Sequence, residues 1–303
     1  MPVAVIDLGT NTFQLLIAEK KENYLQKLFK NSLFVRIGKS GISHRCIAPD
    51  AIFRAVEAMK VHRKTIDEYG VTEIYALATS AVRNADNQKE FLDAIFEATQ
   101  IRVEVIDGNT EADYIFKGVA YEIPLQQMSL IMDIGGGSVE FIIAHHKQML
   151  WKQSFEIGGQ RLLDKFFTED PLPHAQQIVL RYYLQDALQP LWEAVHFYQP
   201  KQFIGSAGAF ETILRIIKFH LDEASLSENQ FSAQSFEWIF EQMTTRSRGE
   251  RLSMRGMIPE RVEMIVPAVC LIKTVVDNCR FSTLQVSTAS LKEGVAVEKL
   301  ELF

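Results

Sequence analysis

Two short phrases in this sequence place an aspartate beside a glycine turn, an arrangement that suits phosphate chemistry. They are Asp7-Leu8-Gly9-Thr10-Asn11-Thr12 and Asp133-Ile134-Gly135-Gly136-Gly137-Ser138. Glycine lets the backbone approach a ligand closely and turn with positive φ, so successive N–H groups can point at phosphate oxygens. Mg²⁺ favours one or two carboxylates together with phosphate oxygens, so we expect Asp7 and Asp133 to hold Mg²⁺ or Mn²⁺. The phosphate ligands expected in the turns are Gly9, Thr10, Asn11, Gly135, Gly136, Gly137 and Ser138.

Each phrase stands between two apolar runs. Residues 3–6 and 13–17 flank the first phrase, and residues 130–132 and 139–143 flank the second. Short apolar runs bounded by turn residues are typical of buried strands. The sequence therefore predicts two similar lobes that face each other across a cleft of the size of a phosphate group.

Glu111 is the candidate catalytic base. It stands in Asp107-Gly108-Asn109-Thr110-Glu111-Ala112, just after a predicted strand and within the first turn of a predicted helix. Phosphoanhydride hydrolysis needs a carboxylate or another base to aim water at phosphorus, and no histidine stands in an obvious motif for this role. A structural explanation stays open, because helix starts favour acidic residues for dipole reasons alone.

Glu140 is a second candidate carboxylate. It follows Ser138 by two residues, so on a strand both side chains point to the same face. That spacing places a carboxylate beside the hydroxyl of the second turn. An exposed glutamate on an edge strand is the alternative.

Further phosphate ligands are expected where strands end. Arg83 follows the hydroxyl-rich segment 78–80, and a guanidinium can grip phosphate bidentately. The phrases at 158–161 and 205–208 each stand between a strand and a helix, where free N–H groups and the helix dipole favour phosphate. An ordinary polar loop would explain the segment at 78–84 about equally well, and glycine turns such as the other two serve a structural purpose in many folds. The residues predicted there are Gly159, Arg161, Gly205, Ser206 and Gly208.

The one basic patch lies between Arg246 and Arg261 and also contains Arg248, Arg251 and Arg255. If these side chains line an extension of the cleft, they would contact phosphates remote from the scissile bond. A solvated helical face is the alternative explanation.

The order of elements predicts an α/β protein with two ribonuclease-H-like lobes. Strands are expected at 3–8, 13–20 and 24–36, followed by an αβαβα order whose last helix starts near Asn109. The order restarts with strands at 129–135, 139–145 and 149–157, and helical segments are inserted later. We therefore predict lobe I over 1–124 and lobe II over 125–303. The terminal helix, at about 290–303, can pack back on lobe I.

Composition narrows the functional classes. The chain has 303 residues, a net charge of −6 and 47% hydrophobic residues, which describes a soluble globular protein and tells against a general nucleic-acid binder. No apolar run approaches the roughly 20 residues that span a bilayer. The start has no basic signal-peptide region, and three cysteines without metal-like spacing predict buried, reduced thiols in the cytoplasm. No membrane partner is expected, and a homodimer is left open.

These motifs together resemble the exopolyphosphatase / guanosine pentaphosphate phosphohydrolase (Ppx/GppA) family of the actin-like, sugar-kinase and Hsp70 ATPase superfamily. The matching phrases follow the family order over nearly the whole chain: 6–12, 78–85, 106–112, 133–140 and Leu291-Lys292-Glu293-Gly294. The resemblance implies that Glu111 is the catalytic glutamate. It also implies that Asp133 and Glu140 order metal and water, that Asp7 acts in the first lobe, and that Arg83 binds phosphate.

The resemblance implies a hydrolase that releases terminal orthophosphate from inorganic polyphosphate by metal-assisted attack of water. The close alternative is hydrolysis of guanosine pentaphosphate, which ends in the same phosphoanhydride. An actin-like small-molecule kinase and a non-catalytic phosphate or nucleotide sensor are the alternatives from other classes. Two features depart from the family: Gln14 stands where arginine or histidine is frequent, and the chain stops at Phe303 without the C-terminal helical domains of longer members.

Overall fold

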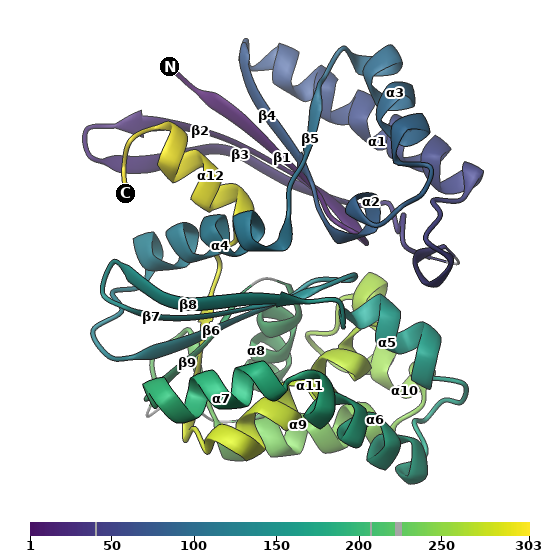
Figure 1. Ribbon diagram of the computed structural model, residues 1–303, viewed down its shortest axis with the longest axis vertical. Coiled ribbons are helices and arrows are strands. Elements are labelled where there is room, and N and C mark those ends of the chain that lie inside the picture. The colour runs from purple at the N-terminus through teal and green to yellow at the C-terminus, as the bar shows by residue number, and fades with distance from the viewer. Residues whose placement is uncertain (40, 207, 222–225) are drawn as a thin grey trace. The chain divides into compact units, whose positions relative to one another are not determined.

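The computed structural model describes the chain from residue 1 to 303 apart from residues 40, 207 and 222–225. It divides into two compact units. Unit 1 contains Met1–Tyr121, Gly135–Ser138 and Ala289–Phe303, and unit 2 contains Glu122–Ile134 and Val139–Thr288. Each unit is built on one mixed sheet (Figure 1), so the predicted α/β class with two ribonuclease-H-like folds is confirmed.

The sheet of unit 1 has the strand order β3-β2-β1-β4-β5. Strands β1 to β3 form an antiparallel meander, and β4 and β5 continue the sheet in parallel to β1. The side chains on one face of β1 and β2 are buried in a core with the helices, and the continuous apolar run of β1 is buried on both faces. The strands are β1 Val3–Leu8, β2 Thr12–Lys21, β3 Tyr24–Phe34, β4 Glu73–Ala78 and β5 Val103–Val105.

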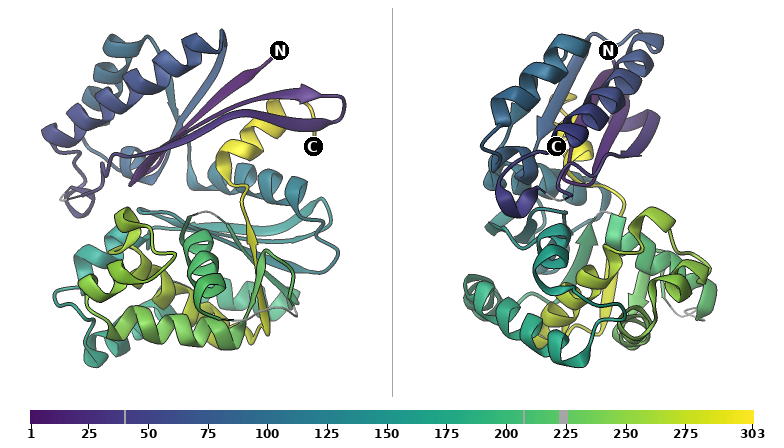
Figure 2. Two further views of the ribbon diagram at one scale, coloured as in Figure 1. Left: turned by 180° about the vertical axis from the view of Figure 1, so that it is seen from behind. Right: turned by 90° about the vertical axis from the view of Figure 1, so that its right-hand side faces the viewer.

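Helices cover both faces of this sheet (Figures 1 and 2). Helices α1 and α3 pack on the face that carries Ala4, Ile6 and Leu8, and α12 contacts β1 and β2 from the other side. Helices α4 and α12 approach closely at Gly118 and Gly294, because a Cβ on Gly118 would lie 3.0 Å from the Gly294 N. The helices are η1 Ile42–His44, α1 Pro49–Glu68, α2 Ser80–Arg83, α3 Gln88–Thr99, α4 Gly108–Glu122 and α12 Leu291–Lys299.

The sheet of unit 2 has the order β10-β11-β9-β6-β7-β8. Its last five strands follow the same topology as unit 1, with β6, β7 and β8 as the meander. The polar sequence at 222–235 predicts a surface loop, and this prediction is wrong for residues 230–235. Residues 230–232 form β10, which pairs with β11, and residues 233–235 begin a helix, while residues 222–225 lie outside the described chain. The strands are β6 Ser129–Ile134, β7 Val139–His145, β8 Gln148–Phe155, β9 Gln202–Ser206, β10 Gln230–Ser232 and β11 Thr283–Ser287.

The helices of unit 2 bury the larger hydrophobic core against one face of their sheet (Figure 1). Leu130, Met132 and Phe141 point into this core. Pro267 lies third in α11, so it stands in the first turn, where its missing N–H costs least, and does not break the helix. The helices are α5 Gly159–Phe166, α6 His174–Ala187, α7 Gln189–Tyr198, α8 Gly208–His220, α9 Ala233–Thr245, α10 Arg248–Ser253, η2 Pro259–Arg261 and α11 Ile265–Cys279.

The cysteines are all free, but they are not all buried. Cys270 is buried, Cys279 is half-buried and Cys46 is exposed, so the prediction of a buried thiol is wrong for Cys46. Burial raises the pKa of the Cys270 thiol to about 12, which makes it inert. Among the described helices, none combines the length and the apolar character needed to cross a membrane.

Candidate active site

The two Asp-Gly turns close in the same way. The backbone N–H of Gly9 donates to the Thr12 carbonyl at 3.0 Å, and that of Gly135 donates to the Ser138 carbonyl at 3.0 Å. None of these glycines has the expected positive φ, since Gly70 and Gly256 are the glycines with positive φ in the described chain. Glycine is needed here for close approach: a Cβ on Gly135 would lie 3.0 Å from the Ser138 carbonyl oxygen.

Residues 135–138 belong to unit 1, where they lie against the first turn. A Cβ on Gly136 would lie 2.7 Å from Asn11 Nδ2, and one on Gly137 would clash with Ser80 Oγ. In the described residues, Asn11 Oδ1 is buried without a hydrogen-bond partner. A buried polar atom of this kind indicates a place for a bound water or ligand. Within unit 1 the predicted phosphate ligands Asn11 and Gly136 are therefore neighbours.

In unit 2 a row of polar side chains crosses the sheet at Asp133. Asp133 pairs with Glu140 on β7 and with Ser206 on β9, and Glu140 pairs with Ser154 on β8. Directly paired residues share a face, and this face lies opposite the core that holds Met132. Ser206 Oγ donates to Asp133 Oδ2 at 2.8 Å, and Ser154 Oγ donates to Glu140 Oε1 at 2.7 Å.

Glu140 is therefore a buried carboxylate that is fixed by a hydrogen bond, and it is not an exposed edge residue. Its relative exposure is 1%, and that of Asp133 is 7%. Removing a carboxylate from water is costly unless it is hydrogen-bonded, and a serine supplies one such hydrogen bond to each acid. Ser154 was not predicted from the sequence, because only the pairing of β7 with β8 reveals it.

The matching row in unit 1 has a different chemistry. Asp7 pairs with Gln14 on β2 and with Leu77 on β4, and the row continues to Ser32 on β3 and Glu104 on β5. This row also lies opposite the main core of its sheet. Glu104 is exposed, so Asp7 is the row's one inner carboxylate.

Glu111 lies in the first turn of α4 and is 8% exposed. The helix start is capped by Asp107, whose Oδ1 accepts a hydrogen bond from Thr110 N at 2.7 Å. That N–H holds the pKa of Asp107 below its usual range. The side-chain cap that the structure shows at this helix start is therefore Asp107.

The carboxylate of Glu111 faces Arg83 instead. Arg83 Nη1 lies 3.1 Å from Glu111 Oε2 and also donates to the carbonyl of Ile106 at 3.0 Å. The side chains are 17% and 11% exposed, so water screens this ion pair less than one on the surface. The structure thus brings together the predicted base and the predicted phosphate ligand in unit 1.

Arg161, another predicted phosphate ligand, forms an ion pair near the start of α5. Its Nη2 lies 2.8 Å from Glu156 Oε2. Gly159 is the first residue of α5 and is buried. The guanidinium of Arg161 is thus partly neutralised by Glu156.

The segment around Gly205 and Gly208 has a packing role that the sequence did not predict. Gly205 leaves room for the buried ring of Phe210, and Gly208 leaves room for the guanidinium of Arg261. Arg261 Nη1 donates to the Gly208 carbonyl and, at 2.9 Å, to Thr212 Oγ1. Burial lowers the pKa of Arg261, and Glu211 at 3.7 Å opposes that shift. Arg261, predicted as part of the basic patch, therefore uses its guanidinium inside unit 2.

The basic patch between 246 and 261 is not one continuous surface. Arg251 is 2% exposed, and its Nη2 lies 2.6 Å from Asp170 Oδ1. Arg248 pairs with Glu263 at 3.2 Å, and Arg255 lies over the ring of Phe219. The prediction that Arg251 contacts a polyanion is therefore wrong, because its charge is used inside the fold.

Comparison with known proteins identifies the family. Residues 16–303 match the Ppx/GppA phosphatase family. A bifunctional 3-dehydroquinate synthase/phosphatase of Fusobacterium nucleatum is 28% identical over 322 residues, covering 98% of this chain, which spans 46% of that protein's length. A putative exopolyphosphatase of Haemophilus influenzae is 25% identical, covering 97% of this chain and 90% of that protein.

Two solved structures extend this result. The crystal structure of an exopolyphosphatase from Cytophaga hutchinsonii has a TM-score of 0.93 and 40% identity, covering 99% of this chain and 98% of the other. A Ppx/GppA family member from Aquifex aeolicus has a TM-score of 0.81 and 24% identity, with 99% and 98% covered, which shows the shared fold. With the family matched from residue 16 to the last residue, this chain belongs to the Ppx/GppA phosphatase family.

Proposed function

We propose that this chain releases terminal orthophosphate from inorganic polyphosphate by attack of water on the outermost phosphorus. The observation that carries the proposal is Glu111, a buried carboxylate that faces Arg83 at the start of a helix capped by Asp107. The exopolyphosphatase from Cytophaga hutchinsonii, 40% identical to this chain, supports the substrate class.

In the proposed mechanism Arg83 exchanges partners. In the structure it neutralises Glu111 across 3.1 Å. A bound terminal phosphoryl group would attract the guanidinium, since Arg–phosphate contacts are charge-assisted and geometrically specific. The carboxylate of Glu111 then gains a water molecule as partner and accepts its proton as that water attacks in line.

In this proposal the two carboxylates of the unit 2 row, Asp133 and Glu140, order the metal and the water. Ser206 and Ser154 fix the rotamers of Asp133 and Glu140 through their hydrogen bonds, so these carboxylates are preorganised. The turn residues Asn11 and Gly136 supply donors to phosphate oxygens.

We further propose that Mg²⁺ or Mn²⁺ is required. Among the described residues no group of three or more His, Cys, Asp or Glu forms a closed metal site. The oxygen donors present fit Mg²⁺, which takes one or two carboxylates and completes its shell with water and phosphate. The candidate ligands are Asp7 in unit 1 and Asp133 in unit 2, and the ion would neutralise charge on the phosphoryl oxygens.

The test is phosphate release measured side by side from long polyphosphate, triphosphate, guanosine pentaphosphate and ATP, without any acceptor. We expect the fastest release from polyphosphate. Faster release from guanosine pentaphosphate would instead indicate a guanosine pentaphosphate phosphohydrolase. Transfer that requires an added hydroxyl acceptor would indicate a kinase.

A further inference from the structure

A cluster of lysines lies on the sheet of unit 1, outside the residues assigned above. Lys27 and Lys30 on β3 both point at Glu293 on α12, with each Nζ 3.5 Å from Glu293 Oε1. Lys292 Nζ lies 3.2 Å from the other oxygen, Oε2. Three ammonium groups thus surround one carboxylate, which leaves an excess of positive charge.

A β-bulge brings the two strand lysines together. The register of β2 with β3 shifts between Ile17 and Ala18, so Lys30 pairs with Leu16 and Lys27 pairs with Ala18. In a regular strand, residues three apart point to opposite faces. The bulge re-aims one of them, so both lysines share a face.

The buried part of the cluster consists of one carboxylate and one ammonium group, so the exposed lysines carry its excess positive charge. Glu293 and Lys292 are 1% and 2% exposed. Burial alone would raise the pKa of Glu293, but Lys292, Lys30 and Lys27 lower it to about 2, so the carboxylate stays ionised. Glu293 Oε1 is buried and accepts no hydrogen bond from the described residues.

The exposed part of the cluster retains donors for a ligand. The side chains of Lys27 and Lys30 are 39% and 40% exposed. An ammonium carries three N–H donors, and a distance of 3.5 Å to Glu293 uses them weakly. In the described chain, Glu293 is the one carboxylate within ion-pair distance of either lysine.

The lysines lie on the same face as the candidate site. Asp7, Gln14 and Ser32 form one cross-strand row, and Lys30 and Lys27 follow Ser32 along β3 on that face. Ser32, Lys30 and Lys27 are all exposed on this edge strand. At about 3.3 Å per residue, Lys30 stands about 7 Å beyond Ser32.

We propose that Lys27 and Lys30, backed by Lys292, form an accessory site for phosphate groups of an extended polyphosphate whose end is bound near Asp7. This inference rests on the proposed function and adds to it a place where the chain remote from the scissile bond is held. A triphosphate is too short to use the lysines, whereas a long polyphosphate can follow β3.

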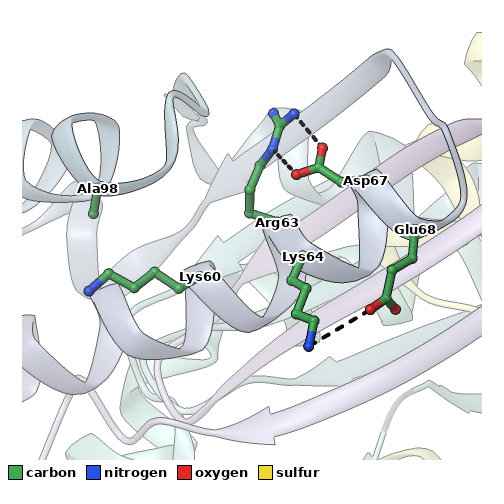
Figure 3. Close-up of a pocket in the computed structure, with 6 residues that line it drawn as sticks. All are labelled: Lys60, Arg63, Lys64, Asp67, Glu68 and Ala98. Carbon is green, nitrogen blue, oxygen red and sulfur yellow. Dashed lines mark hydrogen bonds and ion pairs between the residues drawn. The ribbon is translucent and has the colours of Figure 1, made fainter.

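A matched control lies on the same unit. The open pocket along α1 is lined by Lys60, Arg63 and Lys64, with Asp67 and Glu68 (Figure 3). Its charges pair within the helix, as Figure 3 shows for Arg63 with Asp67 and for Lys64 with Glu68. Lys60 and Lys64 can therefore be neutralised with the same change in net charge.

The experiment compares Lys27→Gln/Lys30→Gln with Lys60→Gln/Lys64→Gln. Binding of long polyphosphate and of inorganic triphosphate is measured by calorimetry, and phosphate release is measured in parallel. We expect the β3 variant to bind long polyphosphate about tenfold more weakly at low salt, with a loss that shrinks as salt rises. The affinity of the β3 variant for triphosphate should equal that of the wild-type chain. The affinities of the α1 control variant for long polyphosphate and for triphosphate should also be unchanged.

The outcomes separate the two proposals. Absence of phosphate release from every substrate by the wild-type chain would overturn the proposed function, whatever the lysines do. Equal affinity of the β3 and α1 variants for long polyphosphate would overturn the accessory site while leaving the hydrolase intact. If the lysines only fasten α12 through Glu293, the β3 variant would lose thermal stability without any dependence on chain length.

Discussion

The two sheets share an Asp-Gly turn and a strand order, yet the rows that cross them at the aspartate carry different charges. In unit 2, Asp133 stands beside Glu140, and two serines hold these acids. In unit 1, Asp7 stands between Gln14 and Leu77. The same backbone thus presents two adjacent carboxylates in one unit and a single inner one in the other.

Unit 1 obtains its second carboxylate from a helix instead of a strand. Glu111 comes from the first turn of α4 and forms an ion pair with Arg83. Glu140 comes from β7 and accepts a hydrogen bond from the Ser154 hydroxyl. An ion pair can exchange its partner when an anion binds, while a serine hydrogen bond mainly fixes a rotamer. This difference is the basis for the proposed division of roles, in which Glu111 of unit 1 is the reactive carboxylate and Asp133 and Glu140 of unit 2 are the orienting ones.

The largest expected effect is loss of the metal. Removing divalent cations with a chelator should abolish phosphate release, and Asp133→Asn should mimic that loss with Mg²⁺ present, because carboxylates and phosphoryl oxygens would otherwise repel each other. Activity is measured before and after Mg²⁺ is added back. Full turnover in excess chelator would contradict a metal-assisted reaction.

Glu111→Gln should lower turnover by about 100-fold or more while leaving the fold and substrate binding intact, because an amide cannot accept the proton of water. Glu104→Gln is the matched control, since Glu104 is an exposed carboxylate of the same unit. Single-turnover phosphate release and substrate affinity are measured for both. A turnover rate of Glu111→Gln equal to that of the wild-type chain would show that this residue is not the base.

Glu140→Gln and Ser154→Ala should have intermediate effects. Because these residues orient other groups, we expect losses of about tenfold in turnover or in metal affinity. Gln14→Ala, the equivalent change in the row of unit 1, should cost less. Mg²⁺ titrations of activity compare the three variants, and a larger loss in Gln14→Ala would reverse the proposed division of roles between the rows.

Much of this arrangement follows from sequence pattern. Short apolar runs bounded by turn residues and the repeated Asp-Gly phrase predict both sheets and place Asp7 and Asp133 at equivalent positions. The start of α4 after a short strand places Glu111. These features depend on local spacing, which a sequence shows directly.

The remaining features depend on contacts between distant segments. Ser154 joins Glu140 through strand register, and Arg261 reaches Gly208 from 53 positions along the chain. The bulge that unites Lys27 and Lys30 arises from pairing with β2 and leaves no signal in β3 itself. The turn glycines were predicted for positive φ, but close packing is their reason, and packing cannot be seen before the fold is known.

The smallest expected effect is the pH dependence of stability that His62 gives to unit 1, and unit 2 has no equivalent buried histidine among its described residues. His62 on α1 is fully buried, and its Nε2 lies 3.4 Å from the Phe13 carbonyl. Its Nδ1 has no hydrogen-bond partner in the described chain. The histidines of unit 2 at 145, 146, 174, 196 and 220 are all at least partly exposed. Burial lowers the pKa of His62 from its ordinary value of 6.5, while the Phe13 carbonyl opposes the shift.

Because the folded state disfavours the charged imidazole, the unfolded chain binds this proton more readily as the pH falls. The stability that His62 contributes is fully present above its unfolded pKa of about 6.5 and is lost progressively below it, toward the lower folded pKa. Chemical denaturation between about pH 7.5 and about pH 5.5 should therefore show unit 1 weakening more than unit 2. Substitution of His62 by Gln should flatten the pH dependence, whereas His196→Gln in unit 2 should leave it unchanged. If the His62 variant does not fold, nuclear magnetic resonance titration of the wild-type imidazole gives the same answer, and a pKa at or above 6.5 would contradict the prediction.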